Sequence, residues 1–196
     1  MHYAGVGSRK TPGPMLEVMR SVGRLLGKKG WTLRSGGAEG ADSAFERGAD
    51  DARGQKEIYL PKARFFGRTD GIDASRLDQH RRALQIAEEH HPNWAALSFV
   101  ARLLMARNCH QVLGEDLQAP SRFVLCWAPS PVVDQAGRVI DTRGGTGQAV
   151  RIAVANGIPV FHLGRPEHRE RVIRMLSKEE SCPSTSTHPG GTGTTA

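Results

Sequence analysis

The chain has 196 residues, of which 38% are hydrophobic and 24% charged. This length and balance predict one globular domain and exclude a disordered chain, a coiled coil and a collagen-like repeat. Lys and Arg together number 27 against 20 Asp and Glu, a net charge of +7, so either an ordinary basic protein or one with an anionic partner, a nucleotide or a nucleic acid, is expected.

Three features predict a cytoplasmic protein. No apolar run approaches the roughly 20 residues that a membrane-spanning helix needs, so no membrane partner is expected. The first residues enter a strand-like segment at once, without the pattern of a signal peptide. The three cysteines, Cys109, Cys126 and Cys182, are odd in number and lack metal-ligand spacing, which indicates a reducing compartment.

Short apolar runs alternate with helical patterns along the chain, which predicts an α/β fold: a single Rossmann-like domain of three layers with a mostly parallel sheet. We expect the domain at residues 1–178. The remainder, 179–196, is rich in Ser, Thr, Gly and Pro and is expected to be disordered. In chain order, the expected elements are strand 2–6, helix 14–28, strand 31–33, a helix from Ala41 to about Ala49, strand 57–60, a loop at 62–71, helix 75–90, helix 93–107 with Asn93 as its N-cap, strand 123–127, a polar connection at 128–143, a helix from about 149 to 156, strand 158–161 and helix 167–177.

Three glycine-rich turns open helices in this pattern. Two directly follow strands, and the third comes after the polar connection. In a parallel sheet such turns lie at the carboxyl edge, where backbone N–H groups and a helix N-terminus can bind phosphate. One such turn would be explained by tight chain reversal alone, but three converging on one edge favour a phosphate site. The turns are Gly5-Val6-Gly7-Ser8-Arg9, Ser35-Gly36-Gly37-Ala38-Glu39-Gly40 and Gly144-Gly145-Thr146-Gly147.

The spacing of these glycines matches neither of two common nucleotide motifs. No Gly-x-Gly-x-x-Gly opens the first helix, and no Walker-type Gly-Lys-Ser/Thr is present. A ligand held without Walker machinery is therefore expected, with no cofactor and no metal. The eight histidines show no zinc spacing.

The first two turns resemble a known family. The stretch Tyr3–Pro12 and above all Ser35–Ala44 are similar to the Rossmann-like core of the DNA-processing protein family DprA (Smf). The third turn is more similar to the Pro-Gly-Gly-x-Gly-Thr motif of the LOG phosphoribohydrolases, which belong with DprA to the SLOG superfamily. Arg107-Asn108 and the following residues also resemble a DprA segment. The whole set resembles short stand-alone members carried by bacteriophages.

The resemblance implies a nucleotide or single-stranded nucleic acid as partner, a role in DNA processing or recombination, and a homodimer. It also adds an arginine and an asparagine to the residues expected to bind the nucleotide or its phosphate. The full set is Gly7, Ser8, Arg9, Ser35, Gly36, Gly37, Gly40, Asp42, Arg107, Asn108, Gly144, Gly145, Thr146 and Gly147.

Several candidates have a second interpretation. Asp42 could cap backbone donors of its helix or hold a ribose hydroxyl. Trp127 could stack on a base, although core packing is the commoner role. Lys10 could meet a phosphate or be solvated. Residues 62–82 carry six Lys and Arg against three Asp, with Phe65 and Phe66 among them. That composition suits single-strand binding, a lid, a dimer contact or a solvated loop.

Catalysis depends on one position. The LOG family has an acidic residue four positions after the third glycine, and here that position holds Arg151. Arginine cannot replace a carboxylate in glycosidic chemistry. We therefore favour binding without catalysis. The alternatives are a LOG-like enzyme that hydrolyses the N-glycosidic bond of a nucleoside monophosphate, with Glu39 or Asp42 as the acid, and a protein that senses or sequesters a nucleotide signal.

Overall fold

Six parallel strands form one sheet, in the order β4-β3-β2-β1-β5-β8. The computed structural model describes residues 1–178, so the expected disordered tail lies outside the described residues. After β1, the strands β2, β3 and β4 are added in turn on one side of it. The chain then crosses to the other side of β1, where β5 and β8 follow. Ligands of open α/β sheets bind at the carboxyl end of such a switch point. The strands are β1 (His2–Gly7), β2 (Thr32–Ser35), β3 (Lys56–Leu60), β4 (Ile72–Asp73), β5 (Val124–Trp127) and β8 (Val160–His162).

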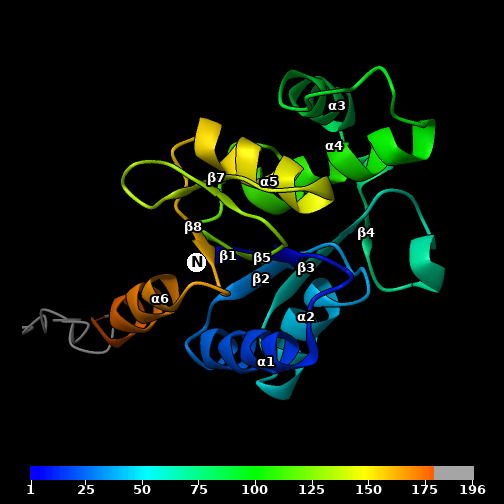
Figure 1. The fold of residues 1–196 in the computed structure, drawn as a ribbon. Helices are drawn as coiled ribbons and strands as arrows, with labels where there is room; N and C mark the ends of the chain where they lie inside the picture. The colour runs from blue at the N-terminus through cyan, green and yellow to red at the C-terminus, as the bar shows by residue number, and fades with distance from the viewer. Residues whose placement is uncertain (179–196) are drawn as a thin grey trace, which may run out of the picture.

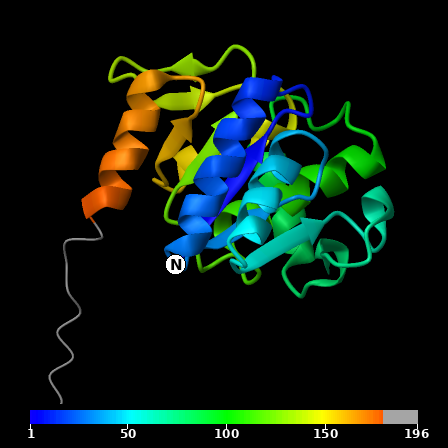
Figure 2. The same ribbon diagram turned by 90° about the horizontal axis from the view of Figure 1, so that it is seen from below.

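Helices cover both faces of the sheet, which confirms the predicted α/β fold of three layers (Figure 1). One face carries α1 (Gly13–Lys28), α2 (Ala41–Asp51) and α6 (Pro166–Lys178). The other carries α3 (His80–Glu89), α4 (Phe99–Leu113) and α5 (Gly144–Ala155). Figure 2 shows α1, α2 and α6 on the near side of the strands.

Alternation along the strands builds two separate cores. Ala4 and Val6 of β1 face α3, α4 and α5, and Tyr3 faces the layer that holds α1 and α2. Gly5, on the same side as Tyr3, leaves room for the ring of Phe45, because a Cβ there would lie 2.7 Å from that ring. The two cores hold β1 rigidly, so the turn after Gly7 has a fixed position.

The middle of the chain departs from the expected elements. The helix expected from residue 75 is a short 3₁₀ turn, Ala74–Arg76, and α3 begins only at His80. The helix expected to start at Asn93 starts six residues later, because Ser98 is its N-cap and accepts a hydrogen bond from the Ala101 N–H at 3.3 Å. That helix also runs on to Leu113. Arg107 therefore lies inside α4. The sequence prediction, which placed Arg107 at the end of the helix, is wrong on this point.

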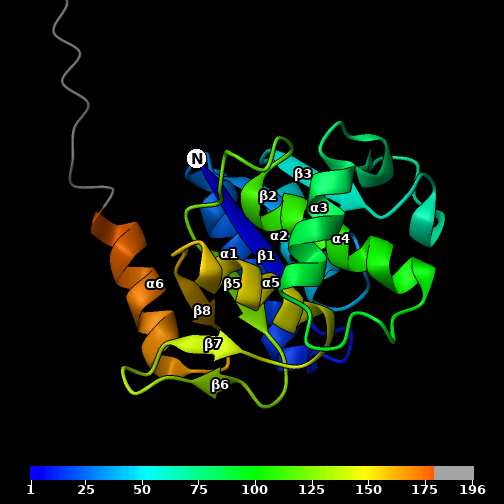
Figure 3. The ribbon, with the colours of Figure 1, turned by 90° about the horizontal axis from the view of Figure 1, so that it is seen from above.

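The polar connection contains a small hairpin that the sequence did not predict. Antiparallel strands β6 (Val132–Val133) and β7 (Val139–Asp141) form it. In Figure 3 the hairpin lies beside α6, and Nε2 of His168 lies 3.1 Å from the carbonyl oxygen of Gly137. The hairpin leads directly into α5, so its docking helps to place the third glycine turn.

Two buried histidines join the hairpin, α6 and β8. Nδ1 of His168 accepts a hydrogen bond from the backbone N–H of His162 at 3.0 Å, and Nδ1 of His162 accepts one from Gly164 at 3.2 Å. A ring nitrogen that accepts a hydrogen bond carries no proton, so each ring is neutral in this arrangement. Burial holds the pKa of both histidines below the usual 6.5.

We expect the free energy of unfolding to fall as the pH drops below about 6.5. At that pH both histidines become protonated in the unfolded chain, whereas their lowered pKa keeps them neutral in the folded protein. Protonation of Nδ1 on either ring also breaks a backbone hydrogen bond worth about 1 kcal/mol. Urea unfolding between pH 8 and pH 5.5 measures this loss. In His168→Asn the amide oxygen can accept the same hydrogen bond without titrating, so the dependence on pH should become shallower. An unchanged dependence in that variant would exclude His168 as a source.

Candidate functional site

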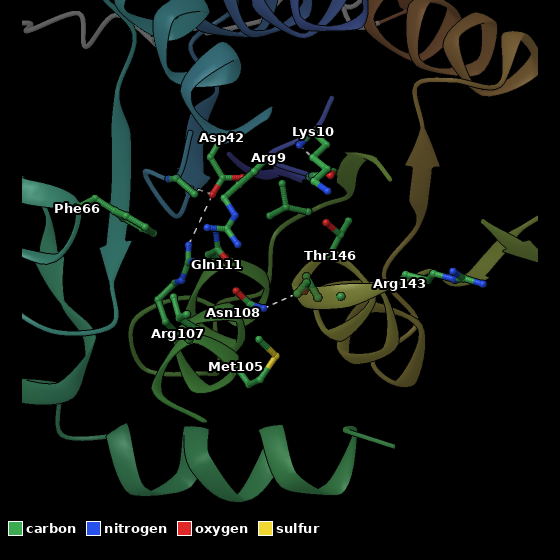
Figure 4. Close-up of a pocket in the computed structure, with 18 of the residues that line it drawn as sticks. Arg9, Lys10, Asp42, Phe66, Met105, Arg107, Asn108, Gln111, Arg143 and Thr146 are labelled. Carbon is green, nitrogen blue, oxygen red and sulfur yellow. Dashed lines mark hydrogen bonds and ion pairs between the residues drawn. The ribbon is translucent and has the colours of Figure 1, made fainter. Parts of the chain in front are cut away.

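A pocket of about 490 Å³ opens at the carboxyl edge of the sheet, where the sequence predicts the phosphate site. The end of β1, the start of α2, the middle of α4 and the first turn of α5 form its walls, and two aromatic residues after β3 complete them (Figure 4). Nine of the fourteen predicted residues line it: Gly7, Ser8, Arg9, Asp42, Arg107, Asn108, Gly144, Gly145 and Thr146.

The other five predicted residues do not line the pocket. Ser35 donates its hydroxyl hydrogen to the carbonyl oxygen of Gly5 at 2.7 Å, and so fixes β2 to β1. Gly37 and Gly40 have φ of +64° and +84°, a region that side chains disfavour. A Cβ on Gly147 would collide with the carbonyl oxygen of Thr142. These residues shape the turns, as does Gly36, whose missing side chain leaves the space that Arg107 fills.

Asp42 and Arg107 form a buried pair at the floor of the pocket. Nη1 of Arg107 lies 3.6 Å from Oδ2 of Asp42, and the two residues are 6% and 5% exposed, respectively. Burial raises the pKa of Asp42 to about 6, although Arg107 and the backbone amides of Ala38, Gly7 and Gly36 act in the opposite direction. The carboxylate of Asp42 thus interacts with backbone amides of both the first and the second glycine turn.

Nε of Arg107 is buried and has no hydrogen-bond partner within residues 1–178. An unpaired buried donor costs about 1–3 kcal/mol. Arg107 lines the pocket, so a ligand oxygen could satisfy this donor.

Two amide side chains of α4 connect the second glycine turn to the third. With its amide oriented as its neighbours require, Gln111 accepts a hydrogen bond from the Gly36 N–H at 2.7 Å and donates one to Oδ1 of Asn108 at 2.8 Å. Asn108 in turn donates to the carbonyl oxygen of Gly145 at 2.9 Å. Gln111 was not among the predicted site residues. Its spacing from Arg107, one turn along the same helix, could have indicated it.

Positive charge surrounds the mouth of the pocket. Arg9 and Lys10 are exposed on the first turn, and the N-terminus of α5 adds the partial positive charge of its free N–H groups. In Figure 4, Arg9 extends towards Asp42 and Gln111, whereas Arg143 points away from the centre. The first turn of α5 contains no acidic residue. The site is therefore suited to an anion.

Aromatic and apolar side chains form the wall opposite α5. Phe66 is 44% exposed, and its ring meets that of Phe65 edge-on at 4.5 Å. Phe66 has a φ of +58°, an uncommon conformation for an aromatic residue. Arg68 anchors this segment through two hydrogen bonds of 2.7 Å to Glu46. A flat ligand group could lie against Phe66.

Three further candidates lie away from the pocket. Arg151 forms an ion pair with Asp141 at 2.5 Å and donates to the carbonyl oxygen of His90, so it faces the hairpin and α3. Glu39 is exposed and does not line the pocket. Trp127 packs against the core on the α1 side of the sheet, the commoner of its two expected roles.

Two further findings concern residues 1–178. No group of three or more His, Cys, Asp or Glu residues in this range is arranged to hold a metal ion. No helix in it combines the length and hydrophobicity required to cross a membrane.

Comparisons with known proteins give structural likeness only. No protein-family model matches the chain, and no curated protein is significantly similar to it. Among solved structures, DNA processing protein A of Helicobacter pylori, which binds single-stranded DNA, is 19% identical with a TM-score of 0.49, covering 89% of this chain and 72% of that one.

Two other solved structures are similar at the same level. DprA of Streptococcus pneumoniae is 18% identical with a TM-score of 0.49, covering 89% of this chain and 56% of its own. The Moco carrier protein of Chlamydomonas rheinhardtii is 17% identical with a TM-score of 0.46, covering 91% and 85%. Likeness of this degree assigns no function, so the function must be judged from the pocket.

Proposed function

We propose that this protein binds a nucleotide, free or as one unit of a single-stranded nucleic acid, in the pocket at the carboxyl edge of the sheet. The phosphate would lie at the first turn of α5. The observation that carries this proposal is that one pocket is lined by that helix N-terminus, by two exposed cations and by a buried arginine whose Nε has no partner among residues 1–178.

The first turn of α5 supports the phosphate. Its leading N–H groups have no partner within the helix. Gly144 and Gly145 are exposed, and with no side chain they let an anion approach these groups closely. Thr146 lines the same wall and can add a hydroxyl donor. Arg9 and Lys10 would reach the phosphate from the opposite turn.

Apolar side chains support the rest of the nucleotide. Met105 and Leu104 of α4 line the pocket together with Phe66. Stacking of a base on an aromatic ring contributes about 1–3 kcal/mol and tolerates any base. A pocket of about 490 Å³ lies within the range of small-molecule sites.

A nucleic-acid strand is the second form that the ligand can take. The sequence resemblance to DprA favours it and extends the proposal to a homodimer that acts in DNA processing or recombination. The net charge of +7 would also attract a polyanion. The exposed Arg64, beside Phe66, would lie along the path of such a strand.

Calorimetric titration with AMP, with a short oligonucleotide and with inorganic phosphate tests the proposal. Saturable binding of AMP supports a nucleotide pocket. Oligonucleotide affinity that falls steeply with salt, and exceeds that of AMP at low salt, supports the strand. Failure of all three to bind the intact chain would refute the proposed function.

We expect little or no release of free base from nucleoside monophosphates. Among the described residues that line the pocket, Asp42 is the one carboxylate. Arg107 and three backbone amides surround it. The position that is acidic in the LOG family is Arg151, which is committed to Asp141. Chromatography after incubation with AMP, GMP, CMP and UMP measures free base. Robust turnover that disappears in Asp42→Asn or Glu39→Gln would establish the hydrolase instead.

A further inference from the structure

We infer that the floor of the pocket recognises the hydroxyl groups of a ribose, so that the ligand is a ribonucleotide and not a deoxyribonucleotide. This inference rests on the proposed function and narrows its ligand class: of the two ligand forms proposed, it selects the free nucleotide and excludes single-stranded DNA from this pocket. The juxtaposition that carries it is a carboxylate and an unpaired guanidinium donor at the floor of an otherwise cationic pocket.

Asp42 has to face a neutral donor. A carboxylate beside a phosphate would repel it, yet Asp42 lines the same pocket as the N-terminus of α5. The part of the ligand nearest Asp42 must therefore carry no negative charge. An O–H group that donates to the carboxylate meets this condition.

Arg107 requires an acceptor at the same place. Its Nε is buried without a partner among the described residues, while Nη1 is held by Asp42 and by Oε1 of Gln111 at 3.2 Å. One acceptor site beside one donor site matches a vicinal diol, in which one hydroxyl donates and its neighbour accepts.

The order of groups across the pocket matches that of a ribonucleotide. In Figure 4, Asp42 and Arg107 lie between Phe66 on one side and Thr146 on the other. A nucleotide places its sugar between base and phosphate. With the base against Phe66 and the phosphate at Thr146, the sugar comes to lie over Asp42 and Arg107.

The same donor and acceptor could serve the edge of a base, so the experiment must vary both the sugar and the base. Calorimetry with AMP, 2′-deoxy-AMP and 3′-deoxy-AMP varies the sugar. GMP, CMP and UMP vary the base. Because hydrogen bonds to charged groups are the stronger ones, we expect removal of one hydroxyl to weaken binding about tenfold or more. We expect a change of base to weaken it less.

Asp42→Asn assigns the effect to the carboxylate. Loss of the charge should bring the ratio of AMP to 2′-deoxy-AMP affinity close to 1. Phenyl phosphate, which has no sugar, should bind this variant at least as well as the natural protein, since a nearby negative charge has gone. Glu39→Gln is the matched control, because Glu39 carries the same charge on the same turn outside the pocket. It should leave the ratio unchanged.

The outcomes separate the two proposals. Equal affinity for AMP and both deoxynucleotides in the natural protein would overturn the ribose inference and leave nucleotide binding intact. A large preference among bases with no preference between sugars would overturn it in favour of base recognition. A ribose preference that survives in a folded Asp42→Asn, checked by thermal unfolding, would overturn the role of Asp42. Absence of binding by every nucleotide would overturn the ribose inference, and it would refute the proposed function as well if the oligonucleotide and inorganic phosphate also failed to bind.

Discussion

Replacement of Gly36 by alanine is expected to lower the free energy of unfolding by about 3 kcal/mol. The new Cβ would fall on the guanidinium group of Arg107 and lie 2.8 Å from Oδ2 of Asp42. Arg107 cannot move aside without giving up its contacts to Asp42 and Gln111. The substitution therefore breaks a buried ion pair and leaves its carboxylate without the charged partner. Urea unfolding followed by tryptophan fluorescence measures the loss.

The dependence of this loss on pH identifies its cause. An unpaired Asp42 can be neutralised by a proton at low pH, so Gly36→Ala should cost more at pH 8 than at pH 5. Gly145→Ala is the matched control, because a Cβ there meets no atom closer than 3.6 Å, the distance to Cε of Met105. A loss below about 0.5 kcal/mol in Gly36→Ala, the range of ordinary surface substitutions, would show that the pair is not needed for stability.

The position of the pocket could be predicted from the sequence because strand order and glycine turns are local signals. Apolar runs gave the five main strands to within a few residues, and parallel strands place their carboxyl ends together. Gly7 and Gly145 lie far apart in the chain, yet both line the pocket. The convergence of the turns followed from topology alone.

The sequence could not predict which glycines line the pocket and which only shape the turns, because that division depends on contacts between segments distant in the chain. Gly36 and Gly145 each belong to a glycine-rich turn that opens a helix, so the sequence predicts the same role for both. In the structure, one is covered by a side chain from α4, whereas the other is exposed at the mouth of the pocket. The sequence also could not show whether Ser35 faces the ligand. In the structure its hydroxyl donates to the carbonyl oxygen of Gly5 in the neighbouring strand. Sequence spacing does not reveal which of two neighbours faces the cavity.

Helix boundaries in the middle of the chain failed for a different reason. Asn93 and Ser98 are both good N-caps, and apolar residues at helical spacing follow each of them. The structure uses Ser98, and the residues before it form an irregular segment in which Trp94 stacks under Arg102 at 5.4 Å. The predicted end of this helix was also wrong, because α4 continues past Arg107 to Leu113. Inside α4, the side chain of Arg107 instead reaches the second glycine turn.

Replacement of Gly145 by valine is expected to abolish nucleotide binding while the fold survives. Gly145 is exposed in the first turn of α5 and lines the pocket. A branched side chain there would cover the N–H groups that we propose hold the phosphate, and loss of two charge-assisted hydrogen bonds weakens binding by at least about 100-fold. Valine has a higher helix propensity than glycine, so the substitution carries no cost of that kind. Gly37→Val is a poorer test, since a φ of +64° strains any side chain at that position.

Ala155→Val provides the control for Gly145→Val. It adds the same β-branched side chain at the other end of α5, where Ala155 is exposed and away from the pocket. Titration with AMP should give natural affinity for Ala155→Val, a small loss for Gly145→Ala and no measurable binding for Gly145→Val, with similar thermal unfolding for all three. Because a phosphate at α5 has to approach the backbone of Gly145, the effect should grow with the size of the side chain. If Gly145→Val folds and binds AMP with natural affinity, the phosphate lies elsewhere, and the turn at Ser8 and Arg9 becomes its place.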